Sequence, residues 1–192
     1  MKRFLVVFCL FPLALSAQSG FKKAGGLRAM ATFAPVWMPF NGNVYYNLSG
    51  NWNYYLSERL SILGEGSYFL NTLQASRSGF VSQHKLLGGL TYHFKANSAF
   101  DPFVGFHPGV GLLRYTKPSA LILVANPPEM DVVPLISVSG GVNYYVGSIF
   151  HFFVHLRYAA GRSHAAYGAL ENLSELQCSV GLGLNLGVKV KQ

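Results

Sequence analysis

Four charged residues attract attention because they interrupt segments that are otherwise almost uncharged. Glu65 and Glu175 are the acids, and Lys85 and Arg157 are two of the bases. Each lies on the polar side of a segment in which apolar and polar residues alternate. Because a charge inside a protein is costly unless it is paired, we expect each acid to have a base beside it.

Hairpin spacing predicts which of these residues meet. When two residues lie opposite one another in a hairpin, the mean of their residue numbers is the residue number at the centre of the loop. The loop that follows Glu65 is centred near residue 75, which pairs Glu65 with Lys85. The loop that follows Arg157 is centred near residue 166 or 167, which pairs Arg157 with Glu175. A one-residue bulge would spoil either match. Arg28 is a further base on the same inward face.

Other chemistry has weaker support. Three of the six histidines are expected to face inward at different heights: His93, His107 and His155. His151 and His155 share one strand face about 13 Å apart, too far to chelate one metal ion. There is no Gly-x-Ser-x-Gly motif, and no Ser/His/acid set can be placed together. We therefore expect no catalytic residue, no metal and no cofactor.

The elements that carry these residues are alternating segments such as VYYNLSGNWNYYL, residues 44–56. Alternation with a period of two indicates a β-strand with one apolar and one polar face. No stretch shows capped helical periodicity, and no domain linker or repeat is visible. Eight such strands are expected, at about 26–35, 43–56, 60–71, 79–94, 101–115, 133–146, 150–161 and 174–189.

The connections between these strands alternate in length. Short connections cover 57–59, 95–100 and 147–149, and mostly longer ones cover 35–42, 72–78, 116–132 and 161–173. This pattern predicts an all-β fold, an eight-stranded antiparallel up-and-down transmembrane β-barrel. Both termini and the short turns would lie on the periplasmic side, and the four longer loops outside.

The direction of the apolar face separates two kinds of barrel. A soluble barrel turns its apolar face inward, whereas a membrane barrel turns it outward. Here the polar face is built from Gly, Ser, Asn and Thr, and only 11% of the whole chain is charged, whereas a soluble surface is normally about a quarter charged. The apolar face carries bulky side chains that form two lipid-facing aromatic girdles near the strand ends: Tyr46, Trp52, Tyr54, Tyr68, Tyr92, Phe94, Tyr144 and Tyr158. We therefore expect the membrane orientation.

The N-terminus has the layout of a secretory signal peptide. Lys2 and Arg3 precede an apolar run that is too short to span a bilayer, and Ala-Leu-Ser-Ala follows at 14–17. The alternative is an N-terminal membrane anchor. We expect a signal peptide over residues 1–17 and a barrel domain over 18–192. The formal net charge of +8 comes without a clustered basic helix, which argues against nucleic acid as a partner.

Three stretches carry a likeness to known proteins: LLGGLTYHF (86–94), DPFVGFHPGVG (101–111) and LGLNLGVKV (182–190). With them the chain resembles the small eight-stranded outer-membrane barrels of the OmpA-like and OmpX-like kind. The resemblance implies a monomer in the outer membrane of a Gram-negative bacterium, exported, inserted by the barrel-assembly machinery, and in contact with lipid and lipopolysaccharide. One departure is the ending Val190-Lys191-Gln192, where such proteins often carry an aromatic residue.

Several functions follow from this resemblance. The first is a non-enzymatic barrel with a structural or interaction role through its extracellular loops. The second is a narrow pore or conduit for small solutes or hydrophobic ligands, in which the charged pairs exchange partners as a gate; the alternative is a static network. The third, a lipid-modifying enzyme, has only Ser163 and His164 in the last loop as candidates. The apolar stretch at 119–130 makes loop 116–132 either a strand extension or a contact surface for an extracellular protein or hydrophobic ligand.

Overall fold

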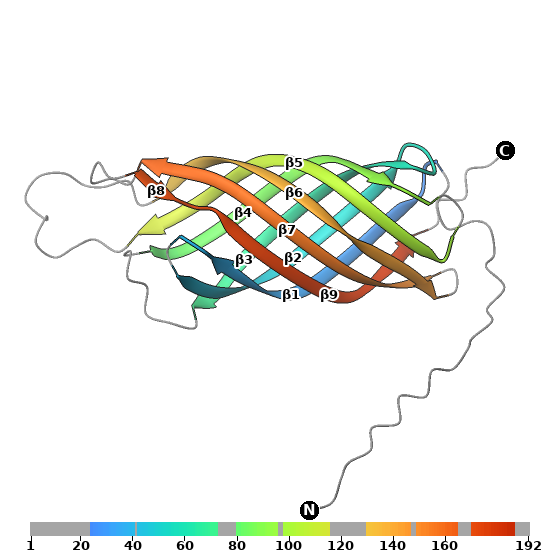
Figure 1. Cartoon of the computed structure of the whole chain (residues 1–192), viewed down its shortest axis with the longest axis horizontal. Coiled ribbons are helices and arrows are strands. Elements are labelled where there is room, and N and C mark those ends of the chain that lie inside the picture. The colour runs from blue at the N-terminus through green and yellow to red at the C-terminus, as the bar shows by residue number, and fades with distance from the viewer. Residues whose placement is uncertain are drawn as a thin grey trace, which may run out of the picture.

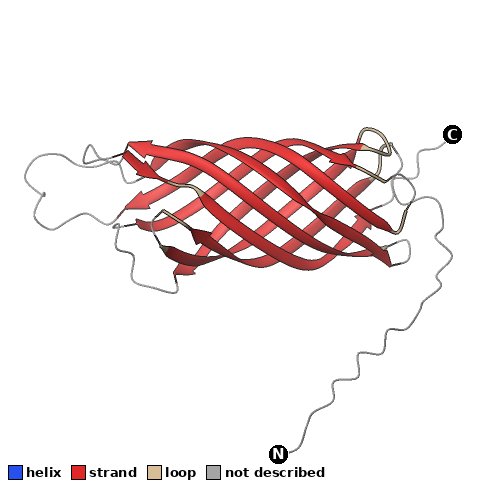
Figure 2. Cartoon of the chain, viewed as in Figure 1, coloured by secondary structure: helices blue, strands red, loops and turns tan. Residues whose placement is uncertain are grey.

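The chain folds into a closed antiparallel β-barrel (Figure 1). The computed structural model describes residues 24–40, 42–72, 80–95, 98–115, 130–146, 149–164 and 170–186. The strands are β1 (Leu27–Met38), β2 (Asn43–Tyr55), β3 (Leu60–Thr72), β4 (Phe80–His93), β5 (Phe100–Tyr115), β6 (Asp131–Val146), β7 (Phe150–His164), β8 (Leu170–Asn172) and β9 (Glu175–Leu186). In this part of the chain only strands, turns and loops are present (Figure 2), and no helix long and apolar enough to cross a membrane is found there.

Each long strand pairs antiparallel with its neighbours in the chain, and the last pairs with the first. Leu27 of β1 lies opposite Leu186 of β9, which closes the sheet. The three-residue β8 only continues the hairpin along the last residues of β7, where Leu170 lies opposite His164. The barrel is therefore built from eight long strands in up-and-down order, as the alternating sequence predicted.

Two of the loops expected to be long are shorter in the structure. β1 continues to Met38, which lies opposite Asn43, so the first connection is a tight turn. The Gly42 amide donates to the Met38 carbonyl at 2.9 Å, and Gly42 adopts a φ of 66°, a conformation that glycine takes without steric cost. β7 likewise continues to His164, so most of the predicted loop 161–173 is hairpin. In both cases the strand continues beyond the last residue that the sequence pattern assigned to it.

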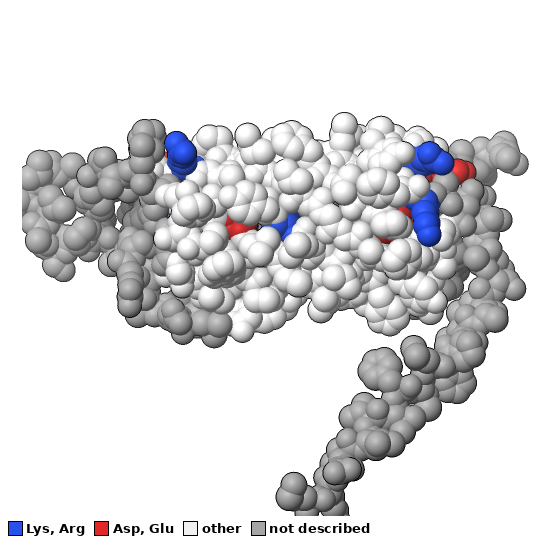
Figure 3. Space-filling view, in the orientation of Figure 1, with Lys and Arg blue, Asp and Glu red and all other residues white. Residues whose placement is uncertain are grey.

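The two faces of the sheet have the predicted contrast. In β2 the side chains alternate along the strand, with Leu48 half exposed and its neighbours Asn47 and Ser49 buried. In Figure 3 the outer surface between the two ends is white apart from a small red and blue area, and the other Lys, Arg, Asp and Glu atoms in view lie near the ends. The apolar face is therefore the outside of the barrel.

Two predicted features fall outside the described residues. These are the signal peptide over residues 1–17 and residues 116–129, which make up most of loop 116–132. The site described below is therefore built from the barrel wall and its interior.

Candidate functional site: the barrel lumen

The lumen of the described barrel contains three ion pairs that involve Lys or Arg. They join Arg28 to Asp101, Glu65 to Arg157, and Lys85 to Glu175. In the order of strands around the barrel, β1 and β5, β3 and β7, and β4 and β9 are each four strands apart. In an eight-stranded barrel that separation is the full diameter, so all three pairs cross the lumen from wall to wall. Such an interior is only just wide enough for side chains.

The pairing predicted from hairpin spacing was wrong. Lys85 lies opposite Ser67, two residues from Glu65, and Arg157 lies opposite Gln177, two residues from Glu175. The loop centres are therefore residues 76 and 167, and an error of one residue in the centre moves a partner by two. Each acid instead reaches a base on the opposite wall, a contact that hairpin spacing does not address.

Glu65 and Arg157 form a two-pronged pair. Both terminal guanidinium nitrogens of Arg157 donate to the two carboxylate oxygens of Glu65, and the Ser67 hydroxyl adds a bond to Glu65 Oε1 at 3.0 Å. Both charged side chains are almost completely buried. This geometry is the strong, orientation-specific form of an ion pair, so it fixes the distance between β3 and β7.

The second crossing pair is held from a third strand. Lys85 Nζ donates to Glu175 Oε1, while the hydroxyl of Tyr45, on β2, donates to Glu175 Oε2. The Lys85 ammonium also lies 5.8 Å from the centroid of the Tyr45 ring. Glu175 thus has both oxygens bonded, which meets the requirement for a carboxylate away from water.

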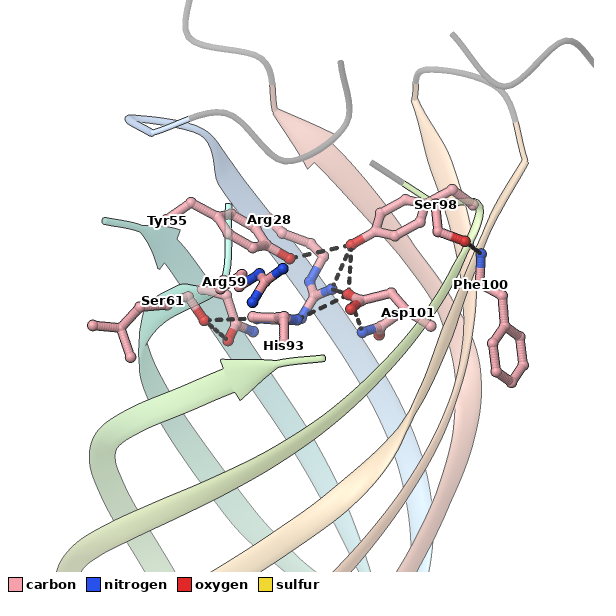
Figure 4. A network of polar contacts seen from close by, with 12 residues as sticks. Arg28, Tyr55, Arg59, Ser61, His93, Ser98, Phe100 and Asp101 are labelled. Atoms are coloured by element: carbon pink, nitrogen blue, oxygen red, sulfur yellow. Dashed lines mark hydrogen bonds and ion pairs between the residues drawn. The ribbon is translucent and has the colours of Figure 1, made fainter. Parts of the chain in front are cut away.

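A third group of polar side chains fills the end of the lumen near the short turns (Figure 4). Asp101 Oδ2 accepts bonds from the Asn143 amide and the Tyr145 hydroxyl, both at 3.2 Å. Arg28 donates to the same Tyr145 oxygen at 3.0 Å and lies 4.0 Å from Asp101. Tyr55 bonds Tyr145 at 3.1 Å. Together with Ser61 and His93, these residues form the turn-end network, to which six strands contribute.

Within the turn-end network, Ser61, His93 and Asp101 form a hydrogen-bonded chain. His93 Nδ1 lies 2.9 Å from Asp101 Oδ2, and His93 Nε2 lies 3.0 Å from Ser61 Oγ. The expectation that no Ser/His/acid set comes together was therefore wrong; the register across β3, β4 and β5 brings these residues together. The order matches a nucleophile, base and orienting acid. However, all three residues are fully buried, and Ser61 Oγ also donates to Asn53 at 3.3 Å, so a substrate carbonyl has no approach to the hydroxyl in this conformation.

At the loop end of the lumen, apolar side chains pack into a cluster. Packed side chains from β1, β2, β5, β6 and the segment before β9 form the loop-end cluster: Val36, Met38, Tyr45, Leu113, Val133 and Leu173. All six are at most 2% exposed, and Phe69 packs against them. The polar face predicted from the sequence therefore does not continue to this end, because β1 extends past residue 35 with Val36 and Met38 facing inward. The cluster closes the lumen below the loops.

Large inward side chains are accommodated by glycines on neighbouring strands. A Cβ on Gly181 would lie 2.9 Å from the Phe153 ring, and one on Gly183 would lie 2.3 Å from the His151 ring. Tyr55, Phe103 and Tyr145 also face inward. The interior is therefore filled by pairing a large side chain with a glycine, rather than by small residues throughout as the sequence suggested.

The other residues predicted from the sequence are the aromatic girdle, the inward histidines, Ser163 and His164. Among the aromatic residues assigned to the girdles, seven are exposed on the outer face: Trp52, Tyr54, Tyr68, Tyr92, Phe94, Tyr144 and Tyr158. Tyr46 is partly covered and stacks on Phe33 at a centroid distance of 4.8 Å. His107 and His155 are buried, as is His93. Ser163 is buried and donates to Asp131 at 2.5 Å, and the side chain of His164 lies outside the described part.

Comparisons with solved structures agree with this architecture. The N-terminal barrel domain of Pseudomonas aeruginosa OprF superposes with a TM-score of 0.61 at 13% identity, over 86% of this chain and all of that one. Neisserial surface protein A gives 0.63 at 13%, over 84% and 96%. P. aeruginosa OprG gives 0.57 at 15%, over 87% and 98%. No protein-family model and no curated protein sequence matches the chain.

The fold is that of the small outer-membrane β-barrels. It decides between the two orientations weighed from the sequence, because transmembrane barrels of this size turn their apolar face to lipid. The half-exposed Leu, Val, Phe, Tyr and Trp side chains of the outer face are therefore the membrane-facing belt of a transmembrane barrel. The buried charges are the interior of that barrel.

Proposed function

We propose that the protein is a non-enzymatic outer-membrane barrel that presents its extracellular loops for contact with partners. Export directed by residues 1–17 would place it in the outer membrane of a Gram-negative bacterium as a monomer, with the short turns in the periplasm. Outer-membrane lipid would surround the belt, and loop 116–132 would contact an extracellular protein or hydrophobic ligand. The likeness to solved outer-membrane barrels supports this placement.

The observation that carries the proposal is the filled lumen. Three ion pairs cross it, and the loop-end cluster occupies its outer end. A barrel packed in this way supports its wall rather than holding a channel, so the loops are the surface left for interaction. The burial of Ser61 and Ser163 argues against a lipid-modifying enzyme.

Two measurements test this proposal. Gel migration of the outer-membrane fraction, with and without heating, should show the faster, heat-sensitive band of a folded barrel. Liposomes that contain the protein should not swell in sugar solutions. A heat-insensitive periplasmic protein would contradict the placement, and rapid swelling would contradict the closed lumen.

A gated narrow pore is the second candidate, and one feature of the register favours it. Glu65 and Lys85 lie on adjacent strands, diagonally by two residues, and so do Arg157 and Glu175. An exchange of partners would therefore replace two pairs across the lumen by two pairs along the wall, with no charge left unpaired. Planar-bilayer recordings of Glu65→Ala and Lys85→Ala test this candidate. It fails if both variants show the same negligible conductance as the unmodified protein.

A further inference from the structure

A groove crosses the membrane-facing surface of β2, β3 and β4, between Ala31 of β1 and Leu112 of β5. It has a volume of about 480 Å³, within the usual range for ligand sites. Its floor is one row across the sheet, in which Ala31, Gly50 and Gly66 lie side by side. Nothing lies within 4 Å of the position of a Cβ on Gly50. The groove exists because this row lacks the bulky side chains that cover the rest of the belt.

The walls of the groove are mostly apolar. The next row toward the loops carries Leu48 and Tyr68, and the next toward the turns carries Trp52, whose ring covers Gly64. Leu86 of β4 bounds the far end. A narrow apolar groove open to the bilayer fits a hydrocarbon chain.

A polar group lies at the loop side of the groove. The backbone pairing between β3 and β4 ends at Ser67 and Lys85. Beyond it, His84 Nδ1 accepts a hydrogen bond from the Phe69 backbone amide at 3.3 Å. The His84 ring packs on the Tyr68 ring with a centroid distance of 4.6 Å. Because Nδ1 accepts, the proton of the neutral imidazole is on Nε2. His84 therefore offers a donor at the upper edge of an apolar groove.

A cation lies one step further toward the loops. Leu112 is opposite His84, and Arg114, two residues on, is opposite Ser82. Arg114 is exposed on the outer face, and no ion pair to it is found among the residues that the structure describes. The four residue steps from Ser82 to Leu86 span about 13 Å along the strand, close to the roughly 15 Å depth of one leaflet. A phosphate at Arg114 would thus place an acyl chain of the same lipid in the groove.

We propose that this groove is a binding site for lipopolysaccharide, with a lipid A acyl chain over Gly50 and Gly66 and a phosphate at Arg114 and His84. Arginine suits a phosphate because its guanidinium can bind two oxygens at once. The inference rests on the proposed placement, which puts the loop end in the outer leaflet.

Native mass spectrometry of the folded full-length protein in detergent tests the site, with purified lipid A as the probe and phosphatidylglycerol as the comparison. We expect one saturable lipid A molecule per barrel and weaker retention of phosphatidylglycerol. Gly50→Leu fills the groove and should weaken lipid A binding by about tenfold or more. The matched control is Gly140→Leu, because Gly140 also faces outward and a Cβ there would meet only ordinary contacts, at 3.6 and 3.9 Å.

A second pair of variants separates a specific phosphate contact of Arg114 from the general effect of removing a positive charge from the outer face. Arg114→Ala should weaken lipid A binding, whereas Arg162→Ala, at an exposed outward position near the end of β7, should not. Equal binding of the two lipids, or equal losses for Gly50→Leu and Gly140→Leu, would overturn the proposed site. Heat-sensitive gel migration of each variant shows that it is folded. Loss of that property in the unmodified protein would instead refute its placement in the membrane.

Discussion

Removing both members of the Glu65–Arg157 pair should destabilise the barrel by less than the sum of the two single removals. In Glu65→Ala the Arg157 guanidinium stays in the lumen, 2% exposed, without the carboxylate that accepts from both its terminal nitrogens. Breaking a buried pair in this way costs about 3–5 kcal/mol, because the remaining charge is uncompensated. We expect a similar cost for Arg157→Ala. The double variant should cost about 1–3 kcal/mol less than the sum of the two, because their effects are coupled.

The measurement is urea unfolding of barrels folded into lipid vesicles. The two tryptophans, Trp37 and Trp52, are both exposed on the outer face, so their fluorescence reports the loss of lipid contact on unfolding. The free energy of unfolding of each single variant and of the double variant gives the coupling. Heat-sensitive gel migration checks that every variant starts folded.

The matched comparison is a double-mutant cycle between Glu65 and Lys85, which measures the coupling energy of these two residues. These residues are near neighbours along the wall, but Glu65 pairs with the Arg157 guanidinium and Lys85 with the Glu175 carboxylate, both on the opposite side. Their coupling should be smaller than that between Glu65 and Arg157. A larger coupling between Glu65 and Lys85 would refute the crossed pairing and would restore the pairing along the hairpin.

Three further predictions concern the wall of the barrel. Leu48→Arg puts a charge on the membrane face and should cost about 2–4 kcal/mol of unfolding free energy in vesicles if it lies near mid-membrane. Asn51→Lys, which puts a charge inside the lumen opposite Glu65, should cost less. Equal costs for the two variants would contradict the orientation of the faces. Gly109→Ala should reduce the folded fraction on a heat-modifiability gel, because its Cβ would lie 2.1 Å from the Leu86 carbonyl oxygen, and Gly50→Ala should not. Cys178, exposed on the outer face, should resist a charged thiol reagent in vesicles and react once urea unfolds the protein; rapid reaction of the folded protein would place it in water.

Strand alternation was enough to predict the architecture, because a period of two is a local property of each segment. VYYNLSGNWNYYL shows both its strand and its two faces without any knowledge of its neighbours. The direction of those faces also followed from the residues, because few charges on the polar face and large aromatics on the other fit a membrane barrel. Only the strand ends shifted, as at Met38, where apolar side chains turn inward.

The contacts inside the lumen depend on which strands face each other across the barrel, and alternation does not encode that. Hairpin spacing compares only adjacent strands, so it paired Glu65 with Lys85 and could not reach Arg157 on the opposite wall. The chain from Ser61 through His93 to Asp101 was missed for a related reason. It spans two hairpins, β3–β4 and β4–β5, so it becomes visible only when the registers of both are combined.

The interior also limits how the protein could conduct. Separating one buried ion pair without replacement costs about 3–5 kcal/mol, and because 1.4 kcal/mol is a factor of ten, fewer than about one barrel in a hundred would have a given pair open. An exchange of partners that forms the pairs Glu65–Lys85 and Arg157–Glu175 avoids that cost. It does not move Val36, Met38 and the rest of the loop-end cluster, which closes the lumen beyond the ion pairs. A pore would therefore need two separate rearrangements, whereas contact through the loops and the lipid-facing groove needs neither.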